Sequence, residues 1–138
     1  MGLEVTSAQV VPSEKLSNIK IDPKSFIYNT SKCDKYALMI FEPETRCIRV
    51  INLDQKFVTK LAIEADYFTP ELLMELYSVF NENNISLIYS KCQNVHSWRT
   101  KFRLEVFIRD IDVAALCLDL EKIDTITKME LLELYASE

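Results

Sequence analysis

Four consecutive side chains before a proline carry groups that can hold a small charged ligand. Asp66, Tyr67, Phe68 and Thr69 stand directly before Pro70. The aspartate can accept an ammonium group, the threonine hydroxyl can donate a hydrogen bond, and the two aromatic rings can wall an apolar pocket. If a helix begins at the proline, its free N–H groups also suit an anionic group. The stretch is therefore a candidate binding corner.

The same residues have a second, purely structural interpretation. Thr69 is placed to be the N-cap of a helix whose first residue is Pro70, and Glu71 stands near the positive end of the helix dipole. Phe68 can pack against the first helical turn as a hydrophobic staple. The two interpretations are compatible, because a capped helix start can still face a ligand.

Several carboxylates lie near this corner in the sequence, but they do not form a catalytic pattern. Glu71 and Glu75 make a like-charged i,i+4 pair that we expect to face water, while Glu64 and Asp66 share one face of a strand. His96 is the only histidine, and we find no nucleophile beside a base. We therefore expect no enzyme activity, no metal and no cofactor.

Glycine and cysteine usage excludes further classes of site. The single glycine, Gly2, leaves no P-loop, no dinucleotide-binding turn and no G-x-S-x-G elbow. The cysteines Cys33, Cys47, Cys92 and Cys117 contain no C-x-x-C pair. Without a secretion signal we expect free thiols, with Cys47 and Cys117 acting as small apolar side chains.

The polar segment 93–100 contains a histidine, a tryptophan and an arginine. His96, Trp98 and Arg99 can bind an anion or stack on a planar ligand. A solvated hairpin tip, with the tryptophan folded back on the sheet, is the simpler interpretation. Both remain open at this point.

Alternating residues on the segment 101–109 allow a comparison with RNA-recognition sheets. Arg103, Glu105, Phe107 and Arg109 share one face, but the glycine-bearing segment of that motif is missing. Residues 61–138 carry seven Lys/Arg against fourteen Asp/Glu, and this excess repels phosphate backbones. We expect no nucleic-acid partner, and an exposed or dimer-covered face with cross-strand charge pairs.

The composition indicates one compact domain. The chain has 138 residues, of which 49% are hydrophobic and 27% charged, and this suits a globular core. No apolar run approaches the roughly 18 residues needed to span a bilayer. The N-terminus lacks the basic flank and apolar block of a signal peptide. We expect a soluble cytoplasmic protein without a membrane partner.

The N-terminal part of the chain shows weak patterning. Residues 1–35 are expected to be an irregular segment that packs on the body, with short strand-like pieces at 19–21 and 26–28. An apolar run at 36–41, a Pro-containing turn and a β-rich run at 46–53 predict a β-hairpin extension over residues 36–56.

From residue 57 the pattern alternates between strand and helix periods. We expect strands at 57–65, 85–92, 101–109 and 126–134, a helix from Pro70 to Asn83, and a second helix beginning near residue 113. Asn83 and Asn84 can end the first helix, because asparagine tolerates the left-handed conformation. The order β-α-β-β-α-β predicts a ferredoxin-like α+β fold, an antiparallel sheet with two helices on one face.

Over residues 57–134 the chain resembles an ACT-type regulatory domain. The matching features are the strand Leu61–Ala65 ending at Asp66, the helix from Pro70, and a second strand that opens on Asn84-Ile85-Ser86-Leu87. The resemblance implies a small effector, often an amino acid, bound between subunits. The implied ligand-binding residues are Asp66, Tyr67, Phe68, Thr69, Asn84, Ile85, Ser86 and Leu87. The family usually has a Pro-Gly-type pair after the aspartate, and two aromatic residues stand there in this chain.

These observations predict a stand-alone regulatory or sensor module that acts on a partner in trans. A homodimer that continues the sheet is expected, because it would cover exposed sheet edges. The alternative is a ligand-free structural or protein-interaction module that uses the hairpin and a sheet edge for docking.

Overall fold

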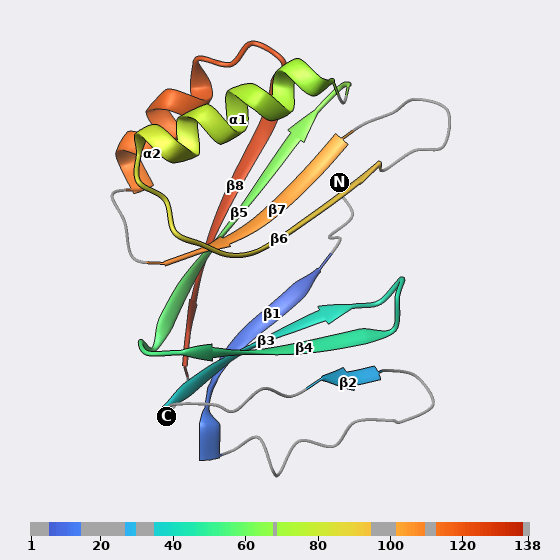
Figure 1. The fold of residues 1–138 in the computed structure, drawn as a ribbon, viewed down its shortest axis with the longest axis vertical. Helices are drawn as coiled ribbons and strands as arrows, with labels where there is room; N and C mark the ends of the chain where they lie inside the picture. The colour runs from blue at the N-terminus through green and yellow to red at the C-terminus, as the bar shows by residue number, and fades with distance from the viewer. Residues whose placement is uncertain are drawn as a thin grey trace. The chain divides into compact units, whose positions relative to one another are not determined.

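The computed structural model describes residues 6–14, 27–29, 35–67, 69–94, 102–109 and 113–136. The chain forms two compact units, residues 1–58 with 133–138 and residues 59–132. The unit boundaries fall inside two strands, β5 (Phe57–Ala65) and β8 (Ile126–Tyr135). The described part contains two helices and two largely antiparallel sheets (Figure 1), which agrees with the expected α+β class.

The first unit contains the sheet β1-β3-β4-β2. Its strands are β1 (Ser7–Pro12), β2 (Ile27–Asn29), β3 (Tyr36–Glu42) and β4 (Cys47–Leu53). β3 and β4 pair antiparallel from Tyr36 opposite Leu53 to Glu42 opposite Cys47. The hairpin turn ends at Arg46, whose backbone φ is 52°. The hairpin lies at the position predicted from the two apolar runs and the proline between them.

Residues 7–12 depart from the irregular structure expected over residues 1–35. They form β1, which pairs antiparallel with β3 from Ser7 opposite Phe41 to Pro12 opposite Tyr36. The cause is a long-range partner, because a strand with weak periodicity is stabilised by the ladder it joins. Ala37, Met39, Ile48 and Val50 form one buried cluster of this unit, and Val11 and Phe41 pack against it.

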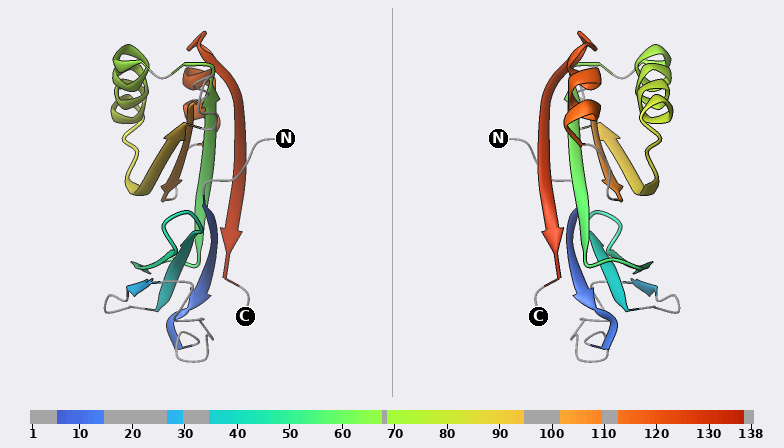
Figure 2. Two further views of the ribbon diagram at one scale, coloured as in Figure 1. Left: turned by 90° about the vertical axis from the view of Figure 1, so that its right-hand side faces the viewer. Right: turned by 90° about the vertical axis from the view of Figure 1, so that its left-hand side faces the viewer.

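The second unit contains the sheet β6-β7-β5-β8 and both helices. The additional elements are α1 (Pro70–Glu82), β6 (Leu87–Asn94), β7 (Phe102–Ile108) and α2 (Val113–Glu121). β7 pairs antiparallel with both β5 and β6. Figures 1 and 2 show β7 between these two strands and the helices beside the sheet.

One core joins both helices to one face of this sheet. Alternate residues of β5 and β7 pack there against the apolar stripes of the helices. The buried members are Leu61, Ile63, Ala65, Leu72, Leu76, Phe80, Phe102, Leu104, Val106, Ile108, Leu116, Leu120 and Ile123. Because all of them belong to one cluster, α1 and α2 cover the same face.

The opposite face of β5 and β7 differs from the sequence-based expectation. We expected an exposed or dimer-covered face, whereas every residue of β7 is buried. Arg103 is 2% exposed, Glu105 0% and Lys60 4%. The cross-strand charge pairs are present, and they make this burial tolerable because each charge has an opposite partner.

Both ends of α1 follow the local signals in the sequence. Thr69 is the N-cap, and its hydroxyl accepts a hydrogen bond from the Leu72 N–H at 3.1 Å. At the other end Asn84 has a φ of 54°. The Asn84 N–H donates to the Asn81 carbonyl at 3.1 Å, and the Ile85 N–H donates to the Phe80 carbonyl at 3.0 Å. This is a Schellman motif with asparagine in the usual glycine position.

Within the described residues, neither helix has the length and hydrophobicity needed to cross a bilayer. The described cysteines are free, with Cys47 buried, Cys117 half-buried and Cys92 exposed. Burial raises the pKa of the Cys117 thiol. This thiol therefore stays protonated at neutral pH and is a poor nucleophile.

Candidate functional site

The corner between β5 and α1 combines an exposed carboxylate with a capped helix start. Asp66 is exposed, and the Tyr67 side chain is 69% exposed. Thr69 is half-buried and holds the first turn of α1 through its hydroxyl. Phe68 lies outside the described residues. The capping interpretation is confirmed, while ligand binding at this corner stays a prediction.

The helix start offers an anion little hydrogen bonding. Pro70 has no N–H, and the Leu72 N–H is already bound by Thr69. Leu73 N–H donates to the Thr69 carbonyl at 3.2 Å. The Glu71 N–H is the remaining first-turn donor, and its own side chain is a carboxylate. The corner therefore suits a cationic group at Asp66 better than an anionic group at the helix end.

The second predicted segment, Asn84–Leu87, follows the other end of α1. Asn84, Ser86 and Leu87 are exposed, and Ile85 packs against the core. Asn84 is fixed by the left-handed turn that ends the helix. Leu87 is the first residue of β6. The amide and hydroxyl groups of this segment are thus open to solvent.

One chain does not bring the two predicted segments together. Ala65 of β5 lies opposite Phe102 of β7, whereas Leu87 of β6 lies opposite Ile108 of the same strand. The segments therefore lie at opposite ends of β7, about 20 Å apart by the rise of a strand. A ligand that touches both must be held by two copies of the chain.

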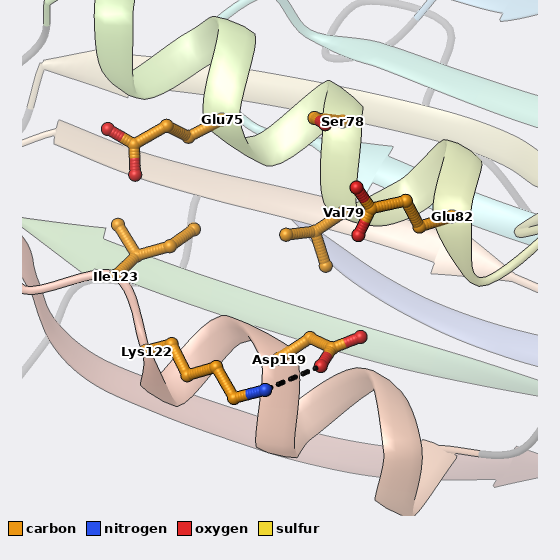
Figure 3. Close-up of a pocket in the computed structure, with 7 residues that line it drawn as sticks. All are labelled: Glu75, Ser78, Val79, Glu82, Asp119, Lys122 and Ile123. Carbon is orange, nitrogen blue, oxygen red and sulfur yellow. Dashed lines mark hydrogen bonds and ion pairs between the residues drawn. The ribbon is translucent and has the colours of Figure 1, made fainter.

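A groove between the helices was not predicted from the sequence. It has a volume of about 300 Å³ and lies between α1 and the end of α2. Its lining residues are Glu75, Ser78, Val79, Glu82, Asp119, Lys122 and Ile123 (Figure 3). The lining has no histidine or cysteine, and its polar groups suit binding a polar group rather than reaction. Only tertiary packing joins these segments, so no local pattern reveals the groove.

Beside this groove, the side chain of Asn83 at the end of α1 forms a hydrogen bond with α2. The Asn83 side-chain amide donates to the Val79 carbonyl and to Asp119 Oδ2, both at 2.9 Å. Lys122 Nζ lies 3.4 Å from Asp119 Oδ1. The Asn83 hydrogen bond, with a smaller contribution from Lys122, lowers the pKa of the Asp119 carboxyl. The carboxylate therefore links the two helices in its ionised form.

A chain of charges crosses the other face of the sheet. Arg103 Nε donates to Glu105 Oε2 at 2.8 Å, and Arg103 Nη1 lies 3.5 Å from Glu64 Oε2. Lys60 Nζ lies 3.5 Å from Glu105 Oε1 and 5.8 Å from the centre of the Phe107 ring. Every charge in this group has an opposite neighbour, so its geometry is that of a structural network.

The described residues hold no group of three or more metal-ligating side chains. His96, Trp98 and Arg99 lie outside the described residues, so the two interpretations of the segment 93–100 stay open. The described residues thus present the β5–α1 corner, the Asn84–Leu87 segment and the helix groove as candidate binding sites.

Comparison with known proteins gives limited similarity. No protein-family model matches the chain, and no curated protein matches it. Among solved structures, a formyltetrahydrofolate deformylase from Pseudomonas putida KT2440 is 12% identical with a TM-score of 0.43, covering 55% of this chain and 28% of that one. A homoserine dehydrogenase from Thiobacillus denitrificans is 13% identical with a TM-score of 0.45, covering 71% and 22%. The matched regions are thus a minor part of both enzymes.

Proposed function

We propose that the chain is a regulatory module with a ferredoxin-like, ACT-type domain over residues 57–134. The observation that carries this proposal is the arrangement of the second unit. Its elements run β5-α1-β6-β7-α2-β8, and its strands lie in the order β6-β7-β5-β8. A β-α-β-β-α-β chain with both helices on one face is the ferredoxin-like arrangement.

The proposed ligand is an amino acid or a similar small effector. Asp66 supplies a carboxylate for its ammonium group. Thr69 accepts from the Leu72 N–H, and its hydroxyl proton remains able to donate to the effector, because a hydroxyl both accepts and donates. Tyr67, whose side chain is 69% exposed, would supply an apolar wall for the corner, and we propose the same role for Phe68, which lies outside the described residues.

A second copy of the chain completes this proposed site. The segment Asn84–Leu87 lies at the far end of β7 within one chain, so the copy that supplies it must be a neighbour. The Asn84 amide and the Ser86 hydroxyl would then receive the carboxylate that the helix start accommodates poorly. The bound pair of chains would pass its output to a protein partner in trans.

A thermal-shift screen against the twenty amino acids and common metabolites tests this proposal. An effector at 100 times its dissociation constant adds about 2.7 kcal/mol to the free energy of unfolding, which raises the melting temperature. We expect Asp66→Asn to abolish the shift and Asp124→Asn, a change at another exposed aspartate, to leave it intact. A shift that survives Asp66→Asn would contradict the proposed site.

The second candidate function is a ligand-free protein-interaction module. The observation that favours it is the exposed edge strand β8, on which Leu131 is 46% and Leu132 51% exposed. Such an edge suits β-strand addition by another chain. If no compound of the ligand panel shifts the melting temperature, while self-association or partner binding is retained, this candidate is favoured.

A further inference from the structure

Within the part of the chain that the structure describes, the edge strand β8 has a neighbouring strand on one side only. It is last in the strand order β6-β7-β5-β8, with β5 as its neighbour. Successive side chains of a strand point to opposite faces, so the exposed Leu131 and Leu132 place apolar surface on both faces of this edge. Proteins usually protect an exposed apolar edge of this kind, because unpaired backbone groups invite another strand.

Two charges of β8, Lys128 and Glu130, lie on one face of the strand, whereas alternation places Glu133 on the other face. Lys128 Nζ lies 2.7 Å from Glu130 Oε1 and 4.0 Å from Glu64 Oε2 of β5. Met129, between them, packs against the helix-covered core. The charged pair is therefore on the face away from the helices, next to the outer edge.

We propose that β8 pairs antiparallel with β8 of a second copy, with Met129 on the two-fold axis. In this register Lys128 of each copy faces Glu130 of the other, and Ile126 faces Leu132. Thr127 faces Leu131 on the helix side. Four alternating charges then surround the axis, and each exposed leucine gains a cross-strand neighbour from the other copy.

The charges select this register over its neighbours. If Lys128 lay on the axis, the two lysines would face each other, and an axis at Glu130 would oppose two carboxylates. Like charges directly opposite each other destabilise a strand pair. An axis at Met129 places residues of the same face opposite one another, so the helices of both copies lie on one side of a continuous sheet.

The other edge of the sheet is less suited to such pairing. β6 has a register shift between Leu87 and Tyr89 where it pairs with β7, and bulges of this kind disturb edge pairing. Because β8 and β6 are opposite edges, pairing through β8 is separate from the contact that brings Asn84–Leu87 to an effector. Either can exist without the other.

Charge reversal with sedimentation velocity tests the proposal on the full chain. We expect a dimer for the unaltered chain and about tenfold weaker dimerisation for Lys128→Glu or Glu130→Lys, because each single change creates two like-charged pairs. The double change Lys128→Glu/Glu130→Lys restores complementarity and should restore the dimer. Lys35→Glu, a reversal at an exposed lysine outside β8, should leave the dimer unaffected.

Cross-linking tests the same register without a charge reversal, which could weaken the fold and reduce dimerisation for that reason alone. With Cys92, the exposed thiol among the described cysteines, changed to serine, Met129→Cys should form a disulfide-linked dimer, because directly opposed strand residues have the separation that a disulfide needs. Thr127→Cys should not, since its counterpart in the second copy is four residues away along the strand. A monomer at micromolar concentration, a dimer insensitive to Lys128→Glu, or cross-linking at Thr127 in place of Met129 would overturn the proposal. Loss of effector binding with an intact β8 dimer would overturn only the proposed ligand site.

Discussion

The hydroxyl of Thr69 is the residue-scale feature on which the β5–α1 corner depends. It satisfies the Leu72 N–H, so Thr69→Ala should lower the free energy of unfolding by about 1 kcal/mol. Thr69→Ser keeps the acceptor oxygen and should retain most of the stability. Urea unfolding measures both variants. Equal stability of the alanine and threonine proteins would mean that the cap contributes nothing.

The left-handed backbone of Asn84 gives a second prediction at this scale. At a φ of 54°, Asn84→Ala should cost about 1 kcal/mol, because a Cβ without a compensating polar group strains this conformation. Asn84→Gly removes the Cβ and should cause no loss. Thermal unfolding compares the two, and a glycine variant less stable than the alanine variant would be inconsistent with the Schellman turn.

The ionisation of Asp119 predicts a pH effect on the contact between α1 and α2. Its pKa is lowered, mainly by the Asn83 amide, so the stabilisation is present above the unfolded-state pKa, near 3.9. It is lost as pH falls through the lower folded-state pKa. A carboxyl NMR titration should show Asn83→Ala moving the pKa of Asp119 toward its ordinary value more than Lys122→Gln does. A larger effect of the lysine change would contradict the assigned cause.

Residue-scale features were predictable where their partners are close in sequence. The Thr69 cap and the asparagine stop after Asn83 depend on residues within one helical turn, and the structure confirms both. The hydrogen bond from Asn83 to Asp119 joins residues 36 positions apart. No pattern in the chain indicates such a pair before the helices are packed.

At the scale of elements, the charges between β5 and β7 are the least expected feature. Glu105 is fully buried and lies within 3.5 Å of Lys60 and 2.8 Å of Arg103. Glu105→Gln should lower the free energy of unfolding by about 3 kcal/mol, because it leaves two buried cations without their shared anion. Lys122→Gln, at an exposed lysine, is the matched control and should have little effect. Equal losses of unfolding free energy for Glu105→Gln and Lys122→Gln, measured by urea unfolding, would show that water solvates these charges.

The elements themselves could be predicted because hydrophobic periodicity is strong from residue 36 onward. The hairpin of β3 and β4, the three strands β5, β7 and β8, and α1 lie at the expected positions within a few residues. The strand β1 was not predicted, because its apolar residues are few and its strand conformation is stabilised by pairing with β3. The burial of Arg103 and Glu105 could not be predicted, because the alternation of residues indicates which face a side chain is on but not whether that face is buried.

At the scale of the whole molecule, the arrangement of the second unit separates the two halves of the proposed ligand site. Asp66–Thr69 and Asn84–Leu87 lie at opposite ends of β7. This separation could not be inferred from the sequence, in which α1 makes the two segments near neighbours. The proposed ligand site would therefore need a second copy of the chain, and effector binding would then be coupled to association.

An NMR titration of the ¹⁵N-labelled chain with amino acids tests this central claim most directly. The account predicts that one effector shifts the backbone signals at both Asp66–Thr69 and Asn84–Leu87, with the shifts saturating together. Saturation of both segments at one concentration would indicate a single ligand held by two copies. Shifts confined to the helix groove, or no shift at either segment with any amino acid, would contradict the account.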